Sequence, residues 1–167
     1  MPDVKHMKWW GWGVEGVSFH HEDKPAFRPF LMKIIDLDVN TPPVSPISLD
    51  DLPIPAPLIS DQLLGELTDA VGADNVVQDD LDRIVHTYGK SATDLLRIRA
   101  GDIPRVPDAV VYPGNEAEVQ LIVDHAVAAD AVIIPYGGGT SFSGSLRPPE
   151  GETRPVVVAD TQDNPGA

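Results

Sequence analysis

The sequence contains no cysteine, and this absence excludes several kinds of site. Without thiols the chain can form no disulfide, no thiolate nucleophile and no cysteine-based zinc or iron–sulfur centre. The five histidines include no His-x-x-x-His pair that would suggest a zinc site, since they stand at His6, His20, His21, His86 and His125. The sequence therefore predicts no metal ligands. No catalytic residues are predicted either, because we expect this chain to end before the catalytic machinery begins.

Basic charge and long apolar runs are also scarce. Twelve lysines and arginines face 26 acidic residues, which gives a net charge of −14. Such an acidic surface disfavours nucleic acids and anionic membranes as partners. No stretch approaches the roughly 20 apolar residues of a membrane span, and residues 1–6 lack the apolar run of a signal peptide. A cytoplasmic location is the expectation, and oligomeric state is left open.

Residues 1–58 are interpreted as an arm followed by a Pro-rich connector. All three tryptophans, Trp9, Trp10 and Trp12, fall between residues 7 and 13, where glycines interrupt any regular element. We expect their indoles to pack onto a neighbouring domain, with a role in ligand binding as the alternative. Six prolines between Thr41 and Pro57 predict an extended connector that lies outside the folded unit.

Residues 59–102 form a predicted helical region. Ser60 is typical of an N-cap before apolar residues at helical spacing, and Gly72 closes that helix. A second helix is predicted from Ser91, with Asp94 completing a capping box. The acidic cluster at residues 79, 80 and 82 lacks the spacing of an EF-hand loop, so we interpret it as a solvated face and not as a cation site.

Residues 103–167 predict an α+β fold. Short apolar strands are expected at 109–112, 132–135 and 155–159, with a helix at 116–129 between the first two. Asn115 and Glu118 have the spacing of a capping box at the start of that helix. Because a strand–helix–strand unit needs a crossover connection, the strands are expected to be mainly parallel.

A Gly-rich loop follows the second of these strands. Successive N–H groups in such a turn form an anion-binding nest, and a diphosphate fits it. The loop lacks the Gly-Lys-Ser/Thr of a P-loop and the Gly-x-Gly-x-x-Gly of a dinucleotide-binding helix. On these residues alone, phosphate binding and a plain connecting loop are equally supported. The candidate residues are Pro135, Tyr136, Gly137, Gly138, Gly139, Thr140 and Ser141.

Residues 103–146 resemble the first half of the FAD-binding domain of the vanillyl-alcohol oxidase / p-cresol methylhydroxylase (PCMH-type) superfamily. The segments 107–111 and 135–141 carry the resemblance. It implies that residues 135–141 wrap the pyrophosphate of FAD. No histidine lies between Pro135 and Leu146, although family members linked covalently to flavin often place one there, so non-covalent FAD is implied.

Residues 7–13 and 86–99 resemble one subfamily, the alkyldihydroxyacetonephosphate synthases, which exchange an acyl group for a fatty alcohol in ether lipid synthesis. That resemblance implies a lipid-like substrate in the full-length enzyme. An FAD-dependent 2-hydroxy acid dehydrogenase, with a hydroxy-acid substrate, and a non-catalytic remnant are the alternatives. The family's second FAD-domain half, substrate domain and catalytic segment have no counterpart here, so we expect 103–167 to be a truncated domain and the fragment to be inactive.

Overall fold

The computed structural model describes residues 8–17, 20–42 and 44–162. Its centre is a four-stranded sheet in the order β1-β2-β4-β3. The strands are β1 (Val76–Val77), β2 (Ala109–Val111), β3 (Val132–Tyr136) and β4 (Val156–Asp160). Strands β2 and β3 each pair parallel with β4, whereas β1 pairs antiparallel with β2. The α+β fold and the three parallel strands expected from the sequence are confirmed; β1 was not predicted, because two residues carry no periodic signal.

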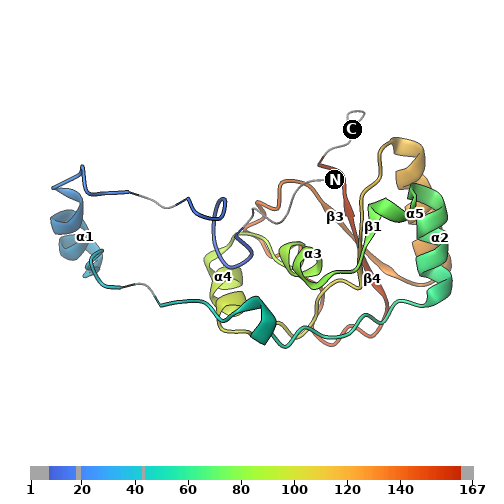
Figure 1. The fold of residues 1–167 in the computed structure, drawn as a ribbon, viewed down its shortest axis with the longest axis horizontal. Coiled ribbons are helices and arrows are strands. Elements are labelled where there is room, and N and C mark those ends of the chain that lie inside the picture. Colours follow the sequence, from blue (N-terminus) through green and yellow to red (C-terminus); the bar gives the residue numbers. More distant parts are fainter. Residues whose placement is uncertain (1–7, 18–19, 43, 163–167) are drawn as a thin grey trace.

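Helices α2 (Asp61–Val71) and α5 (Glu116–Ala128) lie side by side against the sheet (Figure 1). Leu63 and Leu67 of α2 pack with Ile122 of α5 over the side chains of Val111 and Val157. The three caps predicted from the sequence are present, including Ser91, whose Oγ accepts the Asp94 N–H at 3.0 Å at the start of the helix Ala92–Arg99. Ser60 Oγ accepts the Leu63 N–H at 3.3 Å, and the Asn115 side chain accepts the Glu118 N–H at 3.0 Å.

Helices α3 (Asp80–Val85) and α4 (Ala92–Arg99) build a second core with the Pro-rich connector. Leu52 of the connector is buried there with Ile84 and Ile98. The expectation that the connector lies outside the folded unit is therefore wrong for its second half. The described part of the connector contains one 3-10 turn, at Leu49–Asp51. Another 3-10 turn, at Ala73–Asn75, follows helix α2.

The acidic cluster that opens α3 is a solvated face only in part, because Asp79 and Asp80 are exposed but Asp82 is buried. Asp79 caps the helix by accepting the Asp82 N–H at 3.1 Å, and Asp80 pairs with Arg83 at 2.9 Å. Asp82 is buried and accepts the hydroxyl of Tyr112. Burial raises the pKa of Asp82, chiefly by desolvation. Sequence reasoning missed these roles because helix α3 is short and because Tyr112, the partner of Asp82, is 30 positions away in the sequence.

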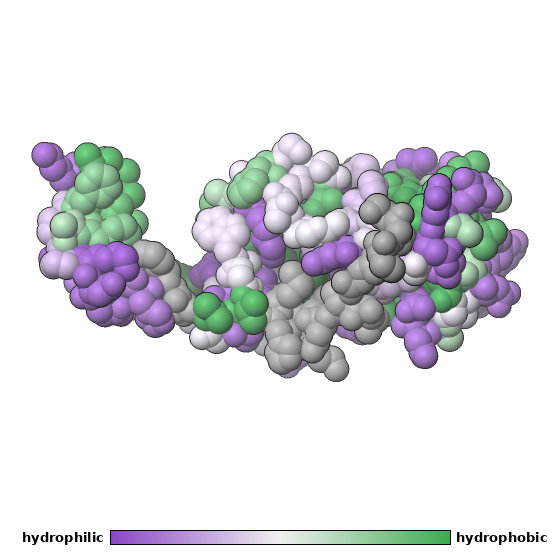
Figure 2. Space-filling view, turned by 90° about the horizontal axis from the view of Figure 1, so that it is seen from above, coloured by the Kyte–Doolittle hydropathy of each residue, from purple (hydrophilic) through white to green (hydrophobic). Residues whose placement is uncertain are grey.

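Helix α1 (Phe27–Ile35) stands apart from the rest of the molecule at the tip of an arm (Figures 1 and 2). None of its residues is buried. It was not predicted, because its surroundings lack capping signals. No helix in the described part of the chain is long and apolar enough to cross a membrane.

Candidate functional site: the glycine loop and its support

The Gly-rich loop leaves the sheet at the carboxyl end of β3. Pro135 and Tyr136 are the last residues of that strand, and Gly137 to Ser141 form the turn beyond it. Asp160, at the carboxyl end of the neighbouring strand β4, pairs with Tyr136. Crevices at the carboxyl ends of parallel strands are the usual place for ligands in α/β sheets. The seven candidate residues are thus contiguous at this edge.

The loop contains a run of backbone N–H groups that have no acceptor among the described residues. Gly137 and Gly138 are exposed, and a Cβ at Gly137 would meet no atom within 4 Å. Among the described residues, the N–H groups of 137–146 donate no hydrogen bond. The hydroxyls of Ser143 and Ser145 lie 3.3 and 2.8 Å from that of Ser141. This array fits a diphosphate, because each phosphate oxygen can accept several such donors.

The inner face of the loop rests on a buried tyrosine. Gly139 has φ +64°, and a Cβ there would stand 2.1 Å from the hydroxyl oxygen of Tyr136. Only glycine fits that contact in the left-handed region. The Tyr136 hydroxyl donates to the Val85 carbonyl at 3.4 Å, and burial raises the pKa of Tyr136 to about 12. The phenol is therefore a neutral support.

A buried histidine completes the support. The ring of His86 lies 4.3 Å from that of Tyr136, centroid to centroid. Its Nδ1 is 2.7 Å from the Asp82 carbonyl, and its Nε2 is 3.1 Å from the Asp160 carboxylate. Because a carbonyl only accepts, Nδ1 must carry a hydrogen. One imidazole thus joins the end of α3 to the end of β4 directly under the loop.

The far end of the loop is held by residues 86–91. The Lys90 N–H donates to the Ser141 carbonyl at 2.9 Å. A Cβ on Gly89 would stand 2.0 Å from that same carbonyl oxygen, so no other residue allows this approach. Sequence reasoning assigned no role in the site to His86, Gly89 or Asp160. Gly89 inside the subfamily-like segment was the only available signal.

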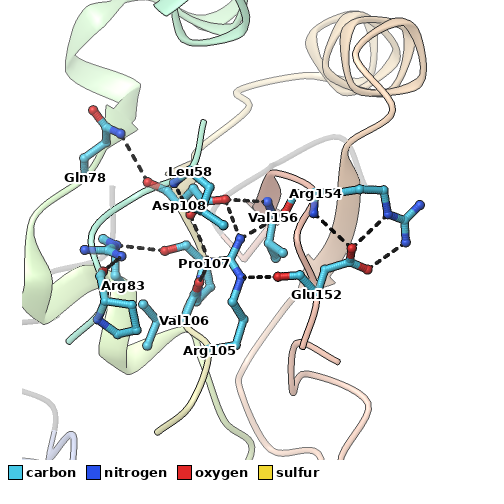
Figure 3. A network of polar contacts seen from close by, with 11 residues as sticks. Leu58, Gln78, Arg83, Arg105, Val106, Pro107, Asp108, Glu152, Arg154 and Val156 are labelled. Atoms are coloured by element: carbon cyan, nitrogen blue, oxygen red, sulfur yellow. Dashed lines mark hydrogen bonds and ion pairs between the residues drawn. The ribbon is translucent and has the colours of Figure 1, made fainter. Parts of the chain in front are cut away.

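The other matching segment, 107–111, has a structural role (Figure 3). Asp108 is buried and makes two hydrogen bonds with Arg105, at 2.7 and 2.9 Å. Its carboxylate also accepts the N–H groups of Leu58 and Val156, at 2.8 and 2.7 Å. Arg83 donates to the adjacent Pro107 carbonyl at 2.8 Å. These contacts fix the connector and strand β4 at the amino end of β2.

Comparison with known proteins agrees with this geometry. Residues 107–161 match the family described as FAD binding domain. Alkyldihydroxyacetonephosphate synthases of Trypanosoma brucei brucei and Caenorhabditis elegans are 29% and 32% identical, each over 93% of this chain and 28% of their own length. Protein Rv2250A of Mycobacterium tuberculosis is 30% identical over 65% of this chain and 70% of its own length.

Solved structures of alkyldihydroxyacetonephosphate synthase, in crystal forms P212121 and P1, superpose with TM-scores of 0.82 and 0.81. They are 27% and 28% identical, over 98% of this chain and 34% of each of those chains. The chain therefore carries part of a PCMH-type FAD-binding domain, a domain whose cofactor is FAD. Among proteins with this domain it is homologous to alkyldihydroxyacetonephosphate synthases, and it spans about a third of their length.

Proposed function

We propose that residues 135–141 hold the FAD pyrophosphate in an enzyme that exchanges the acyl group of an acyl-dihydroxyacetone phosphate for a fatty alcohol. The run of N–H groups at 137–146 without an acceptor among the described residues, next to the exposed Gly137 and Gly138, carries this proposal. Bound FAD would supply the reactive ring system, and this chain's part is to bind and orient the pyrophosphate. The names of the relatives favour this reaction over oxidation of a 2-hydroxy acid.

Non-covalent attachment of FAD is part of the proposal. His86 lies under the loop, but both of its ring nitrogens face oxygen atoms of Asp82 and Asp160. Its ring is 1% exposed. A ring so enclosed offers no free nitrogen to a flavin carbon.

A chimera tests the proposal. This chain replaces the matching segment of the Caenorhabditis elegans relative, and the purified protein is examined for yellow cofactor and for alkyl exchange. We expect both. Gly138→Val should abolish FAD retention, because a branched side chain would fill the nest, whereas Gly65→Val on the exposed face of α2 should retain FAD. Dye reduction by a hydroxy acid without alkyl exchange would favour the alternative, and stoichiometric FAD in Gly138→Val would refute the loop assignment.

The chain alone should bind FAD weakly and catalyse nothing. Each exposed phosphate hydrogen bond contributes on the order of 1 kcal/mol, while association costs an estimated 4–15 kcal/mol. The −14 net charge opposes the anion further. Flavin fluorescence during an FAD titration measures this directly. A dissociation constant below about 1 μM would show that the fragment carries a complete site, and would favour a stand-alone FAD-binding role.

A further inference from the structure

Most lysines and arginines of this molecule are paired with a carboxylate. Eleven of the twelve lie in the described residues, all but Lys5. Seven of the eleven form ion pairs there: Lys24, Arg28, Arg83, Arg97, Arg105, Arg147 and Arg154. The remaining four form none within the described residues: Lys8, Lys33, Lys90 and Arg99. An anion that binds this chain therefore meets few uncommitted cations.

The two cations nearest to the glycine loop in the sequence are among the paired ones. Arg147 donates to the buried carboxylate of Asp94, and Arg154 Nη2 lies 2.7 Å from the Glu152 carboxylate. Because each guanidinium already faces a carboxylate, it offers little net positive charge to a second anion. The loop's own donors are uncharged N–H and hydroxyl groups. A charged partner for a diphosphate would have to come from elsewhere in the chain.

Lys90 is the unpaired cation that lies beside the loop. It lines a cavity of about 330 Å³ together with Gly138 and Thr140, and none of the other three unpaired cations lines that cavity. Its backbone N–H donates to the Ser141 carbonyl at 2.9 Å, which fixes the residue against the loop. The preceding Gly89 permits this approach, because a Cβ there would stand 2.0 Å from the same carbonyl oxygen.

The ammonium group of Lys90 has hydrogen-bond donors to spare. It carries three hydrogens, and within the described residues its Nζ donates to one acceptor, the Gly11 carbonyl, at 3.3 Å. Burial lowers the pKa of Lys90 by desolvation, and no carboxylate among the described residues offsets this effect. A bound anion would offset it, because a nearby negative charge favours the charged form of a lysine.

Trp12 holds the other side of Lys90. Its Nε1–H donates to the Lys90 carbonyl at 3.0 Å, and both residues line the same cavity. Lys90 is therefore fixed to the loop through its N–H and to the arm through its carbonyl and its Nζ. A side chain held in this way loses little conformational freedom when it meets an anion.

We propose that the Lys90 ammonium group pairs with the pyrophosphate of FAD and supplies the positive charge that the glycine loop itself lacks. A charge-assisted hydrogen bond is roughly twice as strong as one between neutral groups. In a chain with a net charge of −14, one local cation also offsets part of the field that opposes a dianion. This role of Lys90 rests on the proposed function, to which it adds a further binding residue.

The chimera with the Caenorhabditis elegans relative measures the contribution of Lys90. Its flavin is removed, and FAD or riboflavin is titrated back while flavin fluorescence is followed. Lys90→Met should weaken FAD binding by about tenfold or more, because a hydrogen bond from a charged group is lost. It should leave riboflavin binding unchanged, because riboflavin has no phosphate. Lys90→Arg keeps the charge and should bind FAD more tightly than Lys90→Met. Lys33→Met, on α1 and away from the loop, should match the parent.

Inorganic pyrophosphate tests Lys90 in the 167-residue chain without any flavin. Nitrogen NMR of the lysine side chains follows the pKa of Lys90, whose signal is assigned by its absence in Lys90→Met. Pyrophosphate, added until the shifts level off, should raise that pKa by about 1 or more, because an anion comes into contact with the ammonium group. Sodium chloride at the same ionic strength should not, and the Lys33 signal should respond equally to both salts.

Equal FAD affinity of Lys90→Met and Lys33→Met would overturn this role of Lys90 and leave the loop assignment standing. Equal losses of FAD and riboflavin binding in Lys90→Met would make Lys90 a purely structural residue, which also overturns the role. A Lys90 pKa that does not respond to pyrophosphate has the same consequence. A parent chimera that takes up no FAD would contradict the proposed function instead, and the pyrophosphate titration would then decide the role of Lys90 by itself.

Discussion

Two arginine–aspartate pairs in this molecule share one geometry and differ in surroundings. In the arm, Arg28 donates to both carboxylate oxygens of Asp38 at 2.8 and 2.7 Å. In the body, Arg105 does the same to Asp108 at 2.9 and 2.7 Å. The arm side chains are 46% and 33% exposed, and the body side chains 6% and 0%.

The difference in burial between the two pairs goes with a difference in how many chain segments each carboxylate holds. Asp108 also accepts N–H groups from the connector and from β4, so its loss frees two chain segments as well as a buried guanidinium. Within the described part of the chain, Asp38 additionally accepts just the nearby N–H of Asn40, at 3.0 Å. A solvated pair exchanges water contacts for protein contacts with little net gain. The body pair organises the fold, whereas the arm pair only joins α1 to the turn that follows it.

The largest expected effect comes from breaking the body pair. Asp108→Ala should lower the free energy of unfolding by about 3–5 kcal/mol, because it leaves the Arg105 charge buried and unpaired. Asp38→Ala should leave the unfolding midpoint unchanged within error. Urea unfolding followed by far-UV circular dichroism measures both.

Asp108→Asn sharpens the same comparison. An amide of the same shape must turn its NH₂ group toward the N–H of Leu58 or of Val156, and two donors cannot pair. We therefore expect Asn to be nearly as destabilising as Ala. If Asn and Ala at 108 both behaved like Ala at 38, burial would not be the source of the difference.

The next largest effect on stability is expected from replacing one of two glycines that have a positive φ. Gly139 in the body (φ +64°) would place a Cβ 2.1 Å from the Tyr136 hydroxyl, whereas Gly16 in the arm (φ +76°) has nothing within 4 Å. Gly139→Ala should destabilise the body by about 1–3 kcal/mol through strain and should displace the loop. Gly16→Ala bears only the local backbone cost and should leave urea unfolding of the body unaltered. Equal shifts for the two variants would contradict the tight packing under the loop.

The sequence predicted the parts of this molecule that depend on local pattern. A signal within a few residues predicts each of these parts: the strands of 103–160, the helix capped by Asn115 and the glycine loop. What it could not predict depends on distant pairing. His86 and Asp160 are 74 residues apart, and neither has a local signal that it supports the loop. Position 89 requires glycine because the Ser141 carbonyl, far away in the sequence, leaves no room for a Cβ there.

The structure of the arm was also difficult to predict from the sequence, for a different reason. Helix α1 has an apolar composition but no buried residue, so its formation owes nothing to a core that a pattern could reveal. The expectation that the indoles pack on a neighbouring region is met by Trp9, which packs against the second core. Trp12 instead remains 60% exposed, and its indole N–H reaches the backbone beside the glycine loop.

A smaller effect is expected at that contact between arm and body. Trp12→Phe keeps the aromatic surface and removes the N–H that donates to the Lys90 carbonyl. The loss should be on the order of 1 kcal/mol in the local opening of the arm, with no change in global unfolding. Hydrogen exchange of the Lys8 amide, which donates to the Gly13 carbonyl within the arm, measures it. Exchange as slow as in the parent chain would show that packing alone holds the arm.

The smallest effect is a titration at the exposed arm pair, where solvent screening keeps the accompanying change in stability small. The hydrogen bonds from Arg28, and then the N–H of Asn40, lower the pKa of Asp38 from 3.8 to about 2. A folded-state pKa below the unfolded value means that the pair favours folding above about pH 4 and loses that contribution as pH falls toward 2. Arg28→Met removes the larger cause, so the pKa of Asp38 should rise toward 3.8 but stop short of it, because the Asn40 N–H remains. Carboxyl carbon NMR shifts during an acid titration measure this.

Adding salt to about 1 M, where the Debye length is about 3 Å, should raise the pKa of Asp38 in the parent chain, because the exposed pair is screened. An Asp38 pKa unmoved by salt and by Arg28→Met would mean that the arm pair is shielded as the body pair is, and the contrast between them would fail.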